Sequence, residues 1–174
     1  KDIIYKNYLG ILENYKYIIH TRFDQLYVDF HNEFDGEKIW IPEGEDYFGI
    51  CDRHAIFPSS IAKEYFGICE YINDPKSLKN PPKKVTPESV FLENLIKNNL
   101  EDRITRIRRN HLTVALKSDN TRWRLAKYKI FFFGGTLMKY PDEFITSIYN
   151  YKKINGILNL LVFRTVFSIN YFYL

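Results

Sequence analysis

Short apolar segments typical of β-strands alternate along this chain with segments of helical spacing, and this alternation limits the fold more than any other feature. Helical spacing is expected over residues 2–14, from Ser59 or Ser60 to Tyr71, from Thr86 as cap and Pro87 to Leu100, and from 140 to 151. Strands are expected around Tyr17–Ile19, over Lys38–Ile41, within 101–116 ending at Leu116, and over 129–133, and Ile50–Phe57 fits either a strand or an active-site loop. The pattern predicts an α/β fold, with a mixed central sheet flanked by helices.

The chain length suits one domain over residues 1–174. The hydrophobic fraction of 45% and the charged fraction of 26% are typical of a globular protein. A net charge of +4 slightly favours an anionic ligand and is too small to indicate a dedicated nucleic-acid binder. Cys51 and Cys69 each lie in an apolar stretch, so we expect buried thiols in a reducing compartment, that is, the cytoplasm.

The two ends of the sequence raise separate expectations. Lys1 opens the chain without a Met, so we expect the sequence to be the C-terminal part of a longer polypeptide. Residues 157–174 form an apolar tail interrupted by Arg164. A charge in the middle of a span costs about 2.5–3.5 kcal/mol on membrane insertion. A buried helix or strand is therefore favoured over weak membrane association of the tail.

Three polar residues alternate after the apolar stretch Tyr17–Ile19: His20, Arg22 and Asp24. In an extended chain, alternate side chains point to the same side. Ligands of open α/β sheets bind outside the carboxyl ends of the strands, which is where these residues would lie. The alternative is a structural Arg–Asp pair on an edge strand.

A second polar group, Asp52, Arg53 and His54, interrupts apolar sequence between Ile50 and Phe57. Burying such groups is costly unless they are paired or lie at a pocket rim, so the trio is either structural or functional. The sequence has no HxxxH or CxxC spacing for zinc and no glycine loop of the Walker or dinucleotide type.

Four motifs in register carry a resemblance to a known family. They are "YxxIIxTRFD" from Tyr15, "IWIPEG" from Ile39, "GICDRHAIFPSSIAKEY" from Gly49 and "TPESVFLENLI" from Thr86. Their order and spacing over about residues 15–100 resemble the glycosyltransferase-like proteins of bacterial surface-polysaccharide clusters and of large DNA viruses. The cytoplasm would be that of the host if the protein is viral.

The resemblance implies a GT-A-like fold that binds a nucleotide-sugar donor and a glycan or polysaccharide acceptor. His20, Arg22, Asp24 and Arg53 would then bind the donor. Arg22 stands where the family's Asp-x-Asp motif has its first acid, so a divalent metal, Mn or Mg, could be held by Asp24 or replaced by the arginine. Only residues 1–16 precede the first strand, so part of the N-terminal nucleotide-binding half would lie upstream of this sequence or be missing.

Inverting glycosyl transfer needs a carboxylate to deprotonate the acceptor hydroxyl. Asp52 is the first candidate, because its loop should face the acceptor and Arg53 could orient it. Glu88 is the second candidate, since a helix N-terminus keeps a carboxylate ionised. Glu88 is equally an ordinary helix-start residue.

Two other classes of function remain open from the residues alone. The arginine-rich region 103–127 could bind single-stranded nucleic acid, with arginines on phosphates and Trp123 or Tyr128 stacking on bases, or it could be a solvated basic face. The chain could also be a non-catalytic remnant or interaction domain of the same fold.

Overall fold

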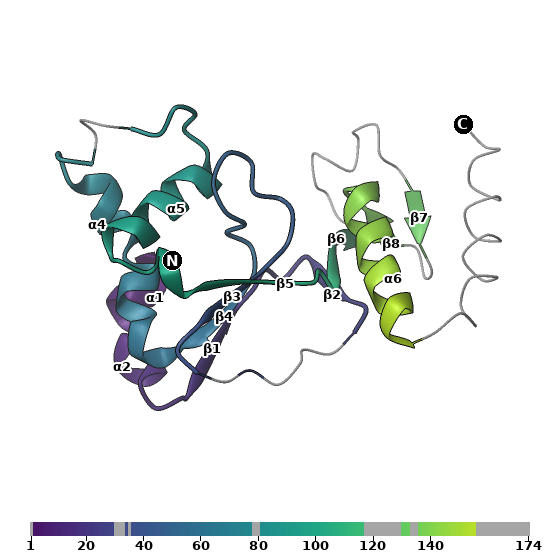
Figure 1. Ribbon diagram of the computed structural model, residues 1–174, viewed down its shortest axis with the longest axis horizontal. Coiled ribbons are helices and arrows are strands. Elements are labelled where there is room, and N and C mark those ends of the chain that lie inside the picture. Colours follow the sequence, from purple (N-terminus) through teal and green to yellow (C-terminus); the bar gives the residue numbers. More distant parts are fainter. Residues whose placement is uncertain are drawn as a thin grey trace. The chain divides into compact units, whose positions relative to one another are not determined.

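The structure is a computed structural model that describes residues 2–29, 34, 36–77, 81–116, 130–132 and 136–155. The chain divides into two compact units (Figure 1). Unit 1 comprises Lys1–Arg22 and Glu33–Ile107, and unit 2 comprises Phe23–Asn32 and Arg108–Leu174. The expectation of one glycosyltransferase-like domain over 1–174 stays a prediction.

Unit 1 contains a four-stranded mixed sheet in the order β1-β4-β3-β5. The strands are β1 (Tyr17–His20), β3 (Ile39–Pro42), β4 (Ala55–Pro58) and β5 (Ile104–Ile107). β4 pairs antiparallel with both β1 and β3, and β3 pairs parallel with β5. β1, β3 and β5 therefore run in one direction, and their carboxyl ends meet the amino end of β4 at one edge of the sheet.

Helices accompany this sheet, as the sequence predicts (Figure 1). They are α1 (Asp2–Asn7), α2 (Leu9–Leu12), η1 (Ser59–Ile61), α3 (Ala62–Phe66), α4 (Ile68–Asn73), α5 (Pro87–Lys97) and η2 (Glu101–Arg103). One core cluster joins the helix side chains Tyr65, Phe66, Phe91 and Leu95 to alternate residues of the strands, among them Ile39 and Ile41. The unit is thus a mixed sheet with helices packed on it.

Helix α5 follows the sequence signals closely. The Thr86 side chain accepts a hydrogen bond from the Ser89 N–H, the Ser89 hydroxyl accepts one from the Thr86 N–H, and Pro87 occupies the first turn. Two longer helices expected from the sequence are broken instead. The first divides at Tyr8 into α1 and α2, and the second divides into η1, α3 and α4, with Gly67 between α3 and α4. Glycine costs about 1 kcal/mol relative to alanine in a helix, which agrees with the second break.

Unit 2 contains a second four-stranded sheet, all antiparallel, in the order β2-β6-β8-β7. Its strands are β2 (Gln25–Tyr27), β6 (His111–Leu116), β7 (Ile130–Phe132) and β8 (Thr136–Met138), and its helix is α6 (Pro141–Asn155). Polar groups join α6 to β6. Glu143 is buried and accepts a hydrogen bond from the Thr113 N–H (2.7 Å), and the Ser147 hydroxyl donates to the His111 carbonyl (2.6 Å).

The structure corrects one strand prediction and decides an alternative that the sequence left open. The single strand expected within 101–116 is two strands, β5 and β6, which belong to different units. Of the stretch Ile50–Phe57, residues 50–54 form a loop and β4 begins at Ala55. The expected turn at 117–120 and the apolar tail 157–174 lie outside the described residues.

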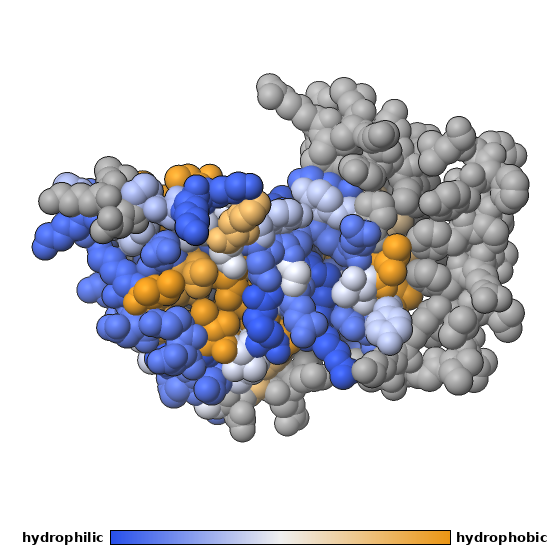
Figure 2. Space-filling view, turned by 45° about the horizontal axis from the view of Figure 1, so that its top comes forward, coloured by the Kyte–Doolittle hydropathy of each residue, from blue (hydrophilic) through white to orange (hydrophobic). Residues whose placement is uncertain are grey.

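On the face drawn in Figure 2 the described residues are mostly hydrophilic, with smaller hydrophobic areas among them. Large apolar side chains that are exposed include Ile3, Ile11, Ile19 and Ile72. Scattered apolar side chains of this kind are ordinary on protein surfaces. Within the described ranges, no helix has both the length and the apolar character needed to cross a bilayer.

Candidate active site at the carboxyl edge of the mixed sheet

A cavity of about 450 Å³ opens in unit 1, beside the carboxyl end of β1 and the amino end of β4. It is lined by His20, Arg22, Asp52, Arg53, Ile68, Cys69 and Pro87. Because β1 and β4 are antiparallel, with His20 opposite Ala55, the end of the first strand faces the segment that precedes the second. The register therefore brings His20 and Arg22 close to Asp52 and Arg53, although Arg22 and Asp52 are 30 residues apart in the sequence.

The first polar group does not lie on one strand. We expected an extended strand that directs His20, Arg22 and Asp24 to the same side, but β1 ends at His20, so this prediction is wrong for Arg22 and Asp24. Arg22 is exposed and lines the cavity. Asp24 belongs to unit 2, where it is half-buried in the turn before β2 and its carbonyl accepts a hydrogen bond from the Val114 N–H (2.8 Å).

His20 is held by aromatic side chains of α3. Its Nδ1 lies 3.0 Å from the Tyr65 hydroxyl, and its ring packs edge-on against Tyr65 and Phe66, with ring centroids 5.7 and 5.8 Å away. Tyr65 is fully buried, and the pKa of its phenol is raised well above the usual value, first by burial and then by Cys51 and Asp52. The phenol therefore stays protonated across the physiological range.

The second polar group lies in the loop between β3 and β4. Asp52 is half-buried, whereas Arg53 and His54 are buried. Sequence reasoning paired Arg53 with Asp52, but the structure pairs the Arg53 guanidinium with Glu45 in an ion pair whose two side chains are 10% and 5% exposed. The sequence did not identify Glu45 as the partner of Arg53, because nothing in it shows which acid of "PEGED" is buried.

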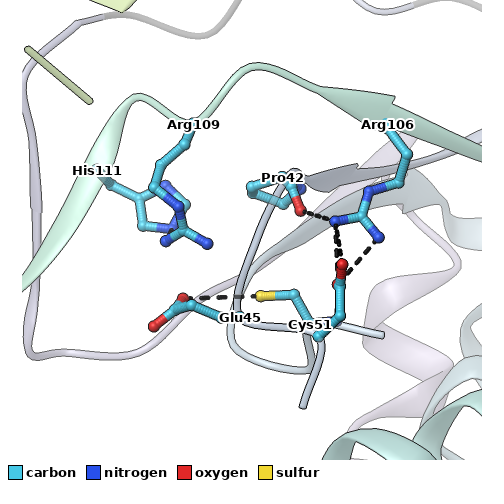
Figure 3. A network of polar contacts seen from close by, with 7 residues as sticks. Pro42, Glu45, Cys51, Arg106, Arg109 and His111 are labelled. Carbon is cyan, nitrogen blue, oxygen red and sulfur yellow. Dashed lines mark hydrogen bonds and ion pairs between the residues drawn. The ribbon is translucent and has the colours of Figure 1, made fainter. Parts of the chain in front are cut away.

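The same loop is strained and held from several sides. Glu45, Tyr47 and Phe48 have positive φ angles of 57°, 35° and 74°, which non-glycine residues rarely adopt. Asp46 accepts hydrogen bonds from the Arg106 guanidinium (3.0–3.1 Å) and from the Cys51 N–H (3.0 Å). Arg106 also donates to the Pro42 carbonyl (2.6 Å), and the Cys51 thiol lies 4.0 Å from Glu45 (Figure 3).

Helix α5 provides the other support for this loop. The Thr86 hydroxyl donates to the Tyr47 carbonyl (2.8 Å), and the Ile50 N–H donates to the Glu88 carbonyl (3.2 Å). Gly49 lies so close to this turn that a Cβ would come within 3.0 Å of backbone atoms of Glu88 and Ser89. The loop that carries Asp52 is therefore packed directly on the first turn of α5.

Glu88 is 7% exposed and is not among the residues that line the cavity, although its neighbour Pro87 is. Of the two carboxylates proposed as base, Asp52 is the one at the cavity wall. The geometry favours Asp52 for this reason.

Three arginines of the basic region have roles within the chain. Arg103 forms an ion pair with Glu37, Arg106 binds Asp46, and Arg109 is buried in unit 2 and donates toward His111 Nε2 (3.4 Å). Arg122, Trp123, Arg124 and Tyr128 lie outside the described residues. The fourth described arginine of this region, Arg108, is exposed, and nucleic-acid binding by region 103–127 stays a prediction.

In the part of the chain that the structure describes, His, Cys, Asp and Glu side chains do not gather in a group of three or more that could hold a metal ion. Metal binding by Asp24 stays a prediction. Comparison with protein-family models, with curated proteins and with solved structures found no match to this chain.

Proposed function

We propose that the protein is a glycosyltransferase of GT-A-like type, which binds a nucleotide-sugar in the cavity of unit 1 and transfers the sugar to a glycan acceptor. One observation supports this above the others. The cavity gathers His20, Arg22, Asp52 and Arg53, four of the six residues that the sequence motifs nominate for donor binding and catalysis. Its place beyond the carboxyl end of β1 agrees with the rule that open α/β sheets bind ligands outside the carboxyl ends of their strands.

The side chains divide into two roles. Arg22 and the His20 ring supply hydrogen-bond donors to the diphosphate, and Arg22 carries most of the attraction because Glu45 offsets the charge of Arg53. The acceptor oxygen attacks the anomeric carbon, and the bond from that carbon to the diphosphate oxygen breaks. The nucleoside diphosphate leaves with the electron pair, and Asp52 takes the hydroxyl proton.

Donor binding is tested by calorimetry with UDP, dTDP and GDP. We expect one of them to bind, and Arg22→Ala to weaken that binding about tenfold or more, because a charge-assisted hydrogen bond contributes about 1.5–3 kcal/mol. Lys63→Ala is the matched control, since it removes one positive charge from an exposed position of α3 that does not line the cavity. Equal affinities for Arg22→Ala and wild type would remove the donor site from this cavity.

Asp24→Ala tests the metal prediction separately. If Asp24 holds a divalent ion on the donor, this change should abolish any stimulation of nucleotide binding by Mn²⁺ or Mg²⁺. Unchanged stimulation in Asp24→Ala would show that this residue holds no such ion.

Catalysis is tested with Asp52→Asn, a nearly isosteric change. If Asp52 is the base, turnover of the nucleotide-sugar falls by about 10²–10⁴-fold while nucleotide affinity is kept. Full turnover by a folded Asp52→Asn protein would make Glu88 the next candidate. A wild-type protein that binds nucleotide but transfers no sugar from any donor would identify the chain as a non-catalytic member of the fold.

A further inference from the structure

Tyr65 is a core residue whose hydroxyl is hydrogen-bonded to His20, a residue that lines the cavity. Its side chain is fully buried, its ring stacks on Phe57 with centroids 3.8 Å apart, and Phe91 packs edge-on against it at 5.1 Å. These contacts leave the ring no room to turn. The hydroxyl is therefore fixed where it meets His20 Nδ1 at 3.0 Å.

The direction of this hydrogen bond follows from the chemistry of its partners. A buried phenol that keeps its proton is a good donor, and a neutral imidazole nitrogen is a much better acceptor than a phenol oxygen. The favoured arrangement has the Tyr65 O–H donating to Nδ1, which places the ring proton of neutral His20 on Nε2. The edge-on contacts of Tyr65 and Phe66 then hold the ring in one orientation.

We propose that Tyr65 is a positioning residue that holds His20 as the Nε2–H tautomer, with this N–H serving as a hydrogen-bond donor to an anionic phosphate oxygen in the cavity. Arg22 is the neighbouring donor, and Asp52 is the acidic group on the same wall. The ligand class rests on the proposed function, whereas the tautomer and its dependence on Tyr65 do not.

The tautomer is read directly from ¹H–¹⁵N correlations of the imidazole nitrogens in ¹⁵N-labelled full-length chain at about pH 8, without ligand. The sequence has four histidines, and His20→Gln identifies the signals of His20. We expect wild-type His20 to carry its proton on Nε2. Wild-type His20 protonated on Nδ1 would overturn the proposal. This measurement uses the wild-type protein alone, so it does not depend on whether a Tyr65 variant folds.

Tyr65→Phe is the next step, because it removes only the hydroxyl. We expect the His20 signals to move toward those of a tautomer mixture, since the bond that selects Nε2–H is gone. Tyr71→Phe is the matched control in α4, where Tyr71 lies against Lys97 and away from the cavity wall. An unchanged His20 tautomer in folded Tyr65→Phe would show that Tyr65 does not position this ring.

Titration with UDP tests the ligand. We expect the His20 Nε2–H signal to shift as UDP binds, and Tyr65→Phe to lower UDP affinity by about two- to tenfold, the value of one neutral hydrogen bond. Bound UDP that leaves the His20 signal in place would refute its role as a donor. If wild type binds no UDP, dTDP or GDP, the proposed function falls, and the ligand-free tautomer still decides the role of Tyr65.

Discussion

Gly49→Ala should destabilise unit 1 because the first turn of α5 occupies the space that the new methyl group needs. A Cβ at this position would come closer than 3.0 Å to the Glu88 carbonyl and to the Ser89 nitrogen, whereas ordinary contacts begin at 3.4 Å. These are backbone atoms of a turn fixed by the Thr86–Ser89 capping box, so they cannot move aside cheaply.

The size of the effect follows from the easiest relief, which is for the loop to lift away from α5. That movement breaks the hydrogen bond from the Ile50 N–H to Glu88 and the bond from the Thr86 hydroxyl to Tyr47. Each is worth about 0.5–1.5 kcal/mol, which gives about 1–3 kcal/mol together. Overpacking of a filled site costs a similar amount. We therefore expect a loss of about 2 kcal/mol, or about 4–8 °C in Tm for a chain of this size.

Thermal and urea denaturation followed by circular dichroism measure this loss. Gly10→Ala is the control, because it makes the same substitution in α2 at a position where a Cβ meets nothing within 4 Å. Alanine is favoured in a helix by roughly 0.5–1 kcal/mol, so this control should be neutral or slightly stabilising. If Gly49→Ala unfolds within about 0.5 kcal/mol of wild type, the loop is not packed on α5 as described.

Three further changes test the same framework. Arg106→Ala should cost about 1 kcal/mol of stability, because it removes the bonds to Asp46 and Pro42, whereas Arg108→Ala at an exposed position should cost nothing measurable by urea denaturation. Thr86→Ala should lower the free energy of unfolding by about 2 kcal/mol, because the helix cap and the hydrogen bond to Tyr47 are both lost. Thr86→Ser keeps the hydroxyl and should retain most of this stability. Equal losses in the two variants would contradict the role of the hydroxyl. Because the pKa of Tyr65 is raised in the folded protein, the unfolded chain releases this proton first as pH rises, so stability should fall above about pH 10. The free energy of unfolding should decline less above this pH in Tyr65→Phe than in wild type. Parallel curves of unfolding free energy against pH for the two proteins would exclude a contribution from Tyr65 ionisation.

The sequence was most informative where local chemistry decides the structure. The Thr86–Pro87 helix start, the buried β3 and the helix after Pro141 follow from capping, apolar runs and spacing. The polar trio at Asp52 was recognised because charges within apolar sequence need a special environment, and the structure provides a cavity wall and an ion pair.

Long-range contacts were beyond the reach of sequence patterns. Hydrophobic periodicity cannot show that β5, which ends at Ile107, and β6, which begins at His111, belong to different sheets, because both segments have the pattern of a strand. The partners of Arg53 and Arg106 are acids of one short loop, and their choice depends on backbone angles that non-glycine residues rarely adopt. The sequence also placed Asp24 beside Arg22 on one strand, because it gave no sign that the strand ends at His20.

The discontinuity of unit 2 has a consequence for how the chain folds. Tyr27 of β2 pairs with His111 of β6 roughly 80 residues later, and closing so long a loop in an unfolded chain costs about 4 kcal/mol of entropy. If unit 1 folds first, it brings these two segments close together and so removes most of this entropy cost from the pairing of β2 with β6. β1 and β5 run in the same direction and are separated by two strands, so the chain leaves unit 1 at Arg22 and at Ile107 from one sheet edge, at points roughly 15 Å apart. We therefore predict that the second sheet assembles after unit 1, so that a destabilising substitution in unit 1 slows the folding of both units, whereas one in unit 2 leaves the folding rate of unit 1 unchanged.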